Sequence, residues 1–107
     1  MKSVIVYQYS IFNLKENSTM KLLKFKQNNC TPCKMVDKFI EEELRTEADE
    51  THIIFAGNKK ADDLALKYGV MQSPTFVLVD DNGEKIDMVR GVGQTKVRAI
   101  FEKRGLL

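Results

Sequence analysis

The sequence predicts a single α/β domain, residues 1–107, with a mixed central sheet of four to five strands and helices on both faces. Apolar and β-branched runs alternate with amphipathic helical patterns, which indicates strands joined by helices and hence parallel members in the sheet. Two strands near the C-terminus are separated by a strong turn signal, which adds an antiparallel edge. The length of 107 residues suits one compact domain, and 43% apolar residues suffice for its core.

The first half of the chain predicts a strand, a short helical turn, a second strand and a longer helix. Residues 3–9 are β-branched and aromatic, as in a strand, and residues 11–16 allow one helical turn. Residues 20–26 predict the second strand, although its three lysines are unusual in a buried strand. Apolar residues recur at helical spacing over residues 32–44, and Pro32 suits the first turn because its missing N–H costs nothing there.

The second half alternates further strands and helices, separated by glycine and Asp-Asp-Asn-Gly turn signals. A glycine directly after a helical pattern and basic residues in a last turn mark two helix ends. The order is therefore β(α)β-α-β-α-β-β-α. The expected elements are strands at residues 52–56, 75–79 and 84–90 and helices at residues 61–68 and 97–104.

Charge and hydropathy exclude several classes of protein. The formal net charge is only +2 and acidic residues are interleaved with basic ones, so we expect no nucleic-acid partner. No apolar run approaches the roughly 20 residues that span a bilayer, so we expect no membrane insertion. The first 16 residues lack the small-residue cleavage site of a signal peptide, which favours a cytoplasmic location. A structural disulfide is disfavoured in that reducing compartment.

The two cysteines of the chain, Cys30 and Cys33, stand two residues apart at the start of a predicted helix. Such a pair can exchange a disulfide with a partner and then resolve the mixed disulfide internally. At a helix start, free N–H groups and the helix dipole favour the thiolate, which makes Cys30 the candidate nucleophile. Cys33 lies inside the helix and is the candidate resolving thiol. Pro32 stiffens the turn between them.

A cysteine pair at this spacing can also form a static disulfide or bind zinc. A static disulfide closing so short a loop gives only about 2 kcal/mol of entropic stabilisation, and the cytoplasm would reduce it. A structural zinc site needs four ligands, whereas the chain offers two Cys and one His, so a carboxylate or a second chain would be required. We therefore expect redox chemistry with no metal and no cofactor other than the Cys30–Cys33 disulfide itself.

Four sequence motifs, in this order and at this spacing, resemble the thioredoxin family. They cover the chain from about residue 20 to about residue 105. They are an active-site segment Cys30-Thr31-Pro32-Cys33-Lys34-Met35, a cis-proline approach of Lys67-Tyr68-Gly69-Val70 followed by Ser73-Pro74-Thr75, a hairpin turn Asn82-Gly83-Glu84, and a groove glycine, Gly91.

The resemblance implies the thioredoxin fold and a protein-disulfide reductase. It implies that the Ser73–Pro74 bond is cis and lies beside the thiols, although by itself Pro74 also suits the plain first position of a strand. It places Thr31, Ser73, Pro74 and Gly91 at the substrate, where the Ser73 backbone would pair with an extended chain. It implies a monomer that acts on disulfide-containing proteins and is reduced by a thioredoxin-reductase-like protein or another thiol reductant.

The chain departs from the family pattern at two positions. Asn29 stands where thioredoxins carry a Trp before the first cysteine, and Lys24 stands where they carry a buried acid. The stem of Lys24 could pack while its ammonium reaches water. Alternatively, its charge lies near the thiols and lowers a thiol pKa. These departures leave two further functions open, a dedicated redox partner of one enzyme such as ribonucleotide reductase, and a non-catalytic binding module.

Overall fold

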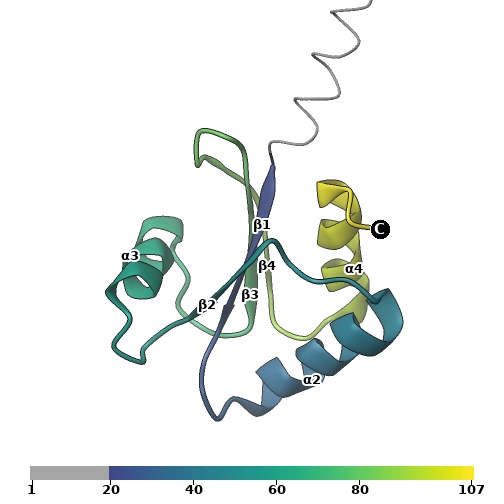
Figure 1. Ribbon diagram of the computed structural model, residues 1–107, viewed down its shortest axis with the longest axis horizontal. Coiled ribbons are helices and arrows are strands. Elements are labelled where there is room, and N and C mark those ends of the chain that lie inside the picture. The colour runs from purple at the N-terminus through teal and green to yellow at the C-terminus, as the bar shows by residue number, and fades with distance from the viewer. Residues whose placement is uncertain (1–19) are drawn as a thin grey trace, which may run out of the picture.

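A four-stranded mixed sheet forms the centre of residues 20–107, the part of the chain that the computed structural model describes (Figure 1). β1 pairs with β2 in parallel and with β3 antiparallel, and β3 pairs with β4 antiparallel. The strand and helical turn expected within residues 3–16 lie outside the described residues. In the sheet order β2-β1-β3-β4, the strands are β2 (Glu50–Ile53), β1 (Lys21–Lys26), β3 (Thr75–Val79) and β4 (Lys85–Arg90).

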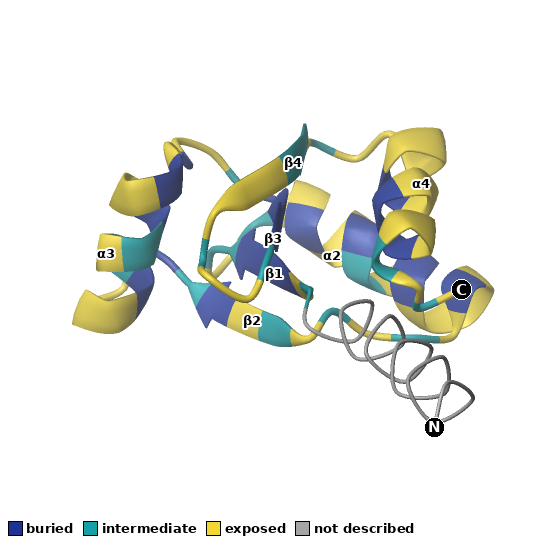
Figure 2. Ribbon diagram, turned by 90° about the horizontal axis from the view of Figure 1, so that it is seen from above, coloured by how far each residue is buried: buried dark blue, intermediate teal, exposed yellow. Residues whose placement is uncertain are grey.

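Helices cover both faces of this sheet, as the sequence predicts. Figure 1 shows α3 on one face and α2 with α4 on the other, and Figure 2 shows the buried sides of these helices turned toward the strands. The elements are α2 (Thr31–Phe39), a five-residue π-helix η1 (Ile40–Leu44), α3 (Lys59–Tyr68) and α4 (Gln94–Arg104).

Alternating side chains of β1 and β3 supply the two halves of the core. Leu22 and Phe76 pack with residues of α2 and α4, whereas Leu23 and Val77 pack with residues of α3. All five residues of β3 are buried, as expected of a strand covered on both faces. By the same alternation, Lys24 faces the layer that holds α2.

The helix predicted over residues 32–44 changes its hydrogen bonding after Phe39. The Arg45 N–H donates to the Ile40 carbonyl at 2.7 Å, the i to i−5 bond of a π-turn. Hydrophobic spacing could not reveal this change, because Ile40 and Leu44 stand four residues apart and both are buried.

The strand predicted over residues 52–56 begins and ends earlier, as β2 over Glu50–Ile53. Its last paired residue, Ile53, lies opposite Lys26 at the end of β1, so no partner strand continues beyond it. Phe55 then adopts a left-handed backbone conformation with φ of 59°, which a strand does not accommodate.

The start of α3 is set by a side-chain cap. Asn58 precedes the helix, and its Oδ1 accepts a hydrogen bond from the Ala61 N–H at 3.1 Å. We expect Asn58→Ala to lower the free energy of unfolding by about 1 kcal/mol, because that N–H loses its acceptor. Urea denaturation checks this value, with Lys60→Ala on the exposed side of the same helix as the control. Equal midpoints for Asn58→Ala and the wild type would contradict the prediction.

Candidate active site

The cysteine pair lies where β1 leads into α2. β1 ends at Lys26, a three-residue turn follows, and Cys30 is the N-cap residue of the helix. Asn29 enters the helix with a left-handed φ of 56°, a conformation that Asn tolerates better than most residues. Cys30 and Cys33 form a disulfide, with their Cα atoms 5.2 Å apart.

The two cysteine residues differ in exposure. Cys30 is half-buried, whereas Cys33 is only 1% exposed. The Cys33 N–H donates to Cys30 Sγ at 3.2 Å, and this N–H is one of the free donors of the helix start. No acidic side chain lies in the first turn of α2. The positive end of this helix therefore favours a thiolate at Cys30 after reduction.

The loop before β3, distant in sequence, contacts the disulfide and is joined in turn to the loop after β4. The Ser73–Pro74 peptide bond is cis, and Ser73 Oγ lies 3.4 Å from Cys30 Sγ. The Gly91 N–H donates to the Pro74 carbonyl at 2.9 Å, which fixes the loop after β4 against the loop before β3. Thr31, beside Cys30, is exposed. The structure therefore brings Ser73, Pro74 and Thr31 to the disulfide and joins Gly91 to them through Pro74.

The ammonium group of Lys24 does not reach water. The prediction that the stem of Lys24 packs while its ammonium is solvated is therefore wrong. The residue is 4% exposed, and its Nζ lies 2.7 Å from Asp37 Oδ1. Lys26 Nζ contacts the other oxygen of Asp37 at 2.6 Å, and Glu47 Oε1 lies 3.8 Å from Lys24 Nζ. Lys24 stands where thioredoxins carry a buried acid. It pairs instead with the carboxylate of Asp37 on α2, four residues after Cys33.

The carboxyl group of Asp37 is held in its charged form. Burial by itself raises the pKa of Asp37, but hydrogen bonds and charge attraction from Lys24 and Lys26 outweigh burial, so the pKa lies below its ordinary value. Asp37 therefore stays a carboxylate between the two lysines at neutral pH.

Asp37 and Gln27 contribute to this region although neither was predicted as a site residue. Asp37 falls within the helix predicted over residues 32–44, at a position outside its apolar spacing. The three lysines in a strand predicted to be buried could have indicated an acidic partner nearby, because a buried ammonium needs an anion. Gln27 accepts a hydrogen bond from the Ser73 hydroxyl at 2.8 Å. No sequence pattern marks it, since it stands in a turn before the motif.

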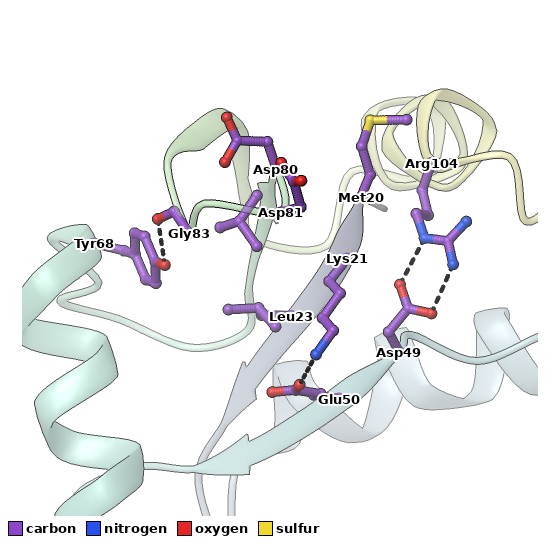
Figure 3. A pocket seen from close by; sticks show the side chains of 11 residues that line it. Met20, Lys21, Leu23, Asp49, Glu50, Tyr68, Asp80, Asp81, Gly83 and Arg104 are labelled. Atoms are coloured by element: carbon purple, nitrogen blue, oxygen red, sulfur yellow. Dashed lines mark hydrogen bonds and ion pairs between the residues drawn. The ribbon is translucent and has the colours of Figure 1, made fainter. Parts of the chain in front are cut away.

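A cavity of about 650 Å³ lies at the other end of β1 from the disulfide (Figure 3). Arg104 forms a two-point ion pair with Asp49, at 2.7 and 3.0 Å. The Tyr68 hydroxyl donates to the Gly83 carbonyl at 2.7 Å. The ion pair joins α4 to the residue before β2, and the Tyr68 hydrogen bond joins α3 to the β3–β4 turn. Both contacts stabilise the fold and lie far from the sulfurs.

Residues 20–107 hold neither a cluster of metal ligands nor a membrane-spanning helix. No three His, Cys, Asp or Glu side chains gather there so as to hold a metal ion. Over the same residues, no helix combines the length and apolar character needed to cross a bilayer.

Comparison with known proteins agrees with this geometry. The family model "Thioredoxin" matches residues 4–103. A thioredoxin of Staphylococcus epidermidis is 34% identical over 82 residues, which cover 77% of this chain and 78% of that protein. The SPbeta prophage-derived thioredoxin-like protein YosR of Bacillus subtilis is 32% identical over 74 residues, covering 69% of this chain and 82% of its own.

Solved structures show the same fold. The thioredoxin of Malassezia sympodialis superimposes with a TM-score of 0.64 at 24% identity, covering 90% of this chain and 84% of that one. The predicted fold, with its mixed sheet and helices on both faces, is thereby confirmed.

Proposed function

The chain belongs to the thioredoxin family, and on that premise we propose that it reduces disulfides in other proteins through Cys30 and Cys33. The proposal depends above all on the unequal exposure of the two cysteine residues. A partner disulfide can reach the half-buried Cys30, whereas Cys33 is 1% exposed and can act only on a sulfur already joined to Cys30.

The reaction proceeds by two exchanges. The Cys30 thiolate attacks one sulfur of a substrate disulfide, forms a mixed disulfide, and expels the other substrate sulfur as a thiolate. The Cys33 thiolate then attacks Cys30 Sγ, closes the Cys30–Cys33 disulfide and expels the second substrate thiolate. The substrate gains two electrons and, from solvent, two protons. The two cysteines lose the same two electrons.

The surface around Cys30 supports binding of an extended substrate. Thr31 is exposed next to Cys30, Ser73 contacts the attacking sulfur, and the Gly91 loop is hydrogen-bonded to Pro74. Met71 and Val92 are exposed on these two loops and offer apolar contacts to a substrate. In this proposal, Thr31, Ser73, Pro74 and Gly91 form the substrate-binding surface.

The proposal includes a supply of electrons. A thioredoxin-reductase-like protein or another thiol reductant returns the disulfide to the dithiol, and a cytoplasmic location would keep that supply available. The exchange chemistry itself needs no metal and no cofactor beyond the two cysteines. The monomeric state expected from the resemblance stays a prediction.

Transfer of electrons to insulin tests the proposal. The protein is reduced with dithiothreitol, freed of reductant and mixed with insulin, and the free thiols on each chain are counted after quenching with acid. We expect one insulin disulfide to be reduced for each Cys30–Cys33 pair oxidised, because two thiols supply two electrons.

The variant Cys30→Ser/Cys33→Ser is the matched control and should transfer none. A folded wild-type protein that transfers nothing to any disulfide would refute the proposal in favour of a binding module. Transfer to insulin that is slow, combined with rapid transfer to a single enzyme such as ribonucleotide reductase, would indicate a dedicated redox partner instead of a general reductase.

A further inference from the structure

A hydrogen-bonded row of polar side chains ends at the sulfur of Cys30. Ser73 Oγ lies 3.4 Å from Cys30 Sγ, and the Ser73 hydroxyl donates to Gln27 Oε1 at 2.8 Å. Gln27 stands in the turn after β1 and Ser73 in the loop before β3. The hydrogen bonds therefore join the two segments that flank the disulfide. All three residues are half-buried, which reduces competition from water.

The hydroxyl of Ser73 has one hydrogen and can donate it in only one main direction at a time. In the disulfide form that hydrogen points to Gln27, because a disulfide sulfur carries no charge and accepts weakly. A thiolate at Cys30 is a much stronger acceptor than an amide oxygen, because hydrogen bonds to charged groups are the stronger ones. The hydroxyl can then rotate toward the sulfur.

Gln27 is suited to both states because its amide carries an acceptor and a donor. Its oxygen accepts from Ser73 in the disulfide form. After rotation of the amide, its NH₂ group can donate to Ser73 Oγ while the hydroxyl donates to the sulfur. A carboxylate at the same place could only accept, and would hold the hydrogen away from Cys30.

We propose that Ser73 and Gln27 form a hydrogen-bond switch that stabilises the thiolate of Cys30. The inference rests on the proposed function, since it concerns the attacking sulfur of the same exchange. Within residues 20–107, the donors that reach Cys30 Sγ are the Cys33 N–H and this hydroxyl. Ser73 contacts the reacting atom and is a catalytic residue, whereas Gln27 acts through Ser73 and is a positioning residue.

The test measures the pKa of Cys30 from the pH dependence of its alkylation by iodoacetamide. Each variant is made in the Cys33→Ser background, so that only one thiol reacts. Loss of the donor in Ser73→Ala should lower the thiolate fraction at acidic pH about tenfold, which is a pKa about one unit higher. Ser73→Thr keeps a hydroxyl and should restore a pKa close to that of the parent.

A double-mutant cycle separates the switch from a simple charge effect. Gln27→Glu should raise the pKa of Cys30, both by its charge and by holding the Ser73 hydrogen. In the Ser73→Ala background the second contribution is lost, so the same substitution should raise the pKa less. Equal effects in both backgrounds would overturn the switch.

An unchanged pKa in Ser73→Ala would overturn the whole inference. This result is distinguishable from failure of the proposed function, because wild-type insulin reduction is measured in parallel. Electron transfer with an unchanged pKa refutes only the role of Ser73 and Gln27.

Discussion

Replacing Cys33 with serine is expected to leave a substrate covalently attached to Cys30, whereas replacing Cys30 should leave no substrate attached. The Cys33→Ser protein can still make the first attack, because the half-buried Cys30 keeps its position at the start of α2. It then lacks the thiol that attacks the mixed disulfide. In both variants, steady-state insulin reduction should fall to the rate without protein.

Non-reducing electrophoresis followed by mass spectrometry of the adduct checks this asymmetry. The adduct of Cys33→Ser should disappear on treatment with dithiothreitol, which shows that it is a disulfide. The Cys30→Ser protein is the matched control, since it also keeps one thiol, but a thiol that is 1% exposed. Equal trapping by the two variants would reverse or abolish the roles assigned to these cysteines.

Replacing Asp37 with asparagine is expected to lower the free energy of unfolding by about 3 kcal/mol. Lys24 is 4% exposed and its Nζ lies 2.7 Å from Asp37, so the substitution leaves a buried ammonium without its close anion. Glu47, 3.8 Å from the same Nζ, compensates only in part because its side chain is largely exposed. Urea denaturation at neutral pH measures the loss.

Two further variants show whether the loss comes from the unpaired charge. The double variant Lys24→Met/Asp37→Leu removes the buried lysine together with its anion and should unfold close to the wild type. Lys59→Ala removes one member of an exposed ion pair, Lys59–Asp63, and should change nothing measurable. An Asp37→Asn protein as stable as the wild type would show that Lys24 does not depend on this carboxylate.

The same cluster gives a dependence on pH whose direction follows from the lowered pKa of Asp37. Because this pKa is lower in the folded than in the unfolded chain, its contribution is complete above the unfolded pKa of about 3.9. The contribution is lost as the pH falls from there through the folded pKa. The difference in stability between the wild type and Asp37→Asn should therefore shrink below about pH 4.

Sequence patterns predicted the elements of this domain better than their pairing. The pattern predicts a strand over Thr75–Val79 because all its residues are apolar or β-branched, and the structure has that strand with the same bounds. Its antiparallel pairing with β1 could not be predicted from periodicity, since both strand directions give the same alternation. The resemblance to a family supplied the neighbourhood of Pro74 and the cysteines, which are far apart in the chain.

The missed contacts depend on side chains that meet across elements. Lys24 and Asp37 stand on a strand and a helix, and each pattern taken alone is compatible with exposure. Gln27 and Ser73 lie in separate loops, where sequence carries no periodic signal. Such pairs become visible only when β1, α2 and the loop before β3 are placed together.

The position of Cys30 as the cap of α2 couples the chemistry of the protein to its folding. In the proposed exchange the reacting residue, Cys30, also begins a helix whose Val36 and Phe39 lie in the core between the sheet, α2 and α4. An anion is a better cap than a neutral sulfur, so whatever stabilises the thiolate in the folded chain also stabilises the reduced fold by the same free energy. We therefore expect each cycle of the proposed exchange to pass between two states of different conformational stability, and hydrogen exchange in α2 to report the redox state.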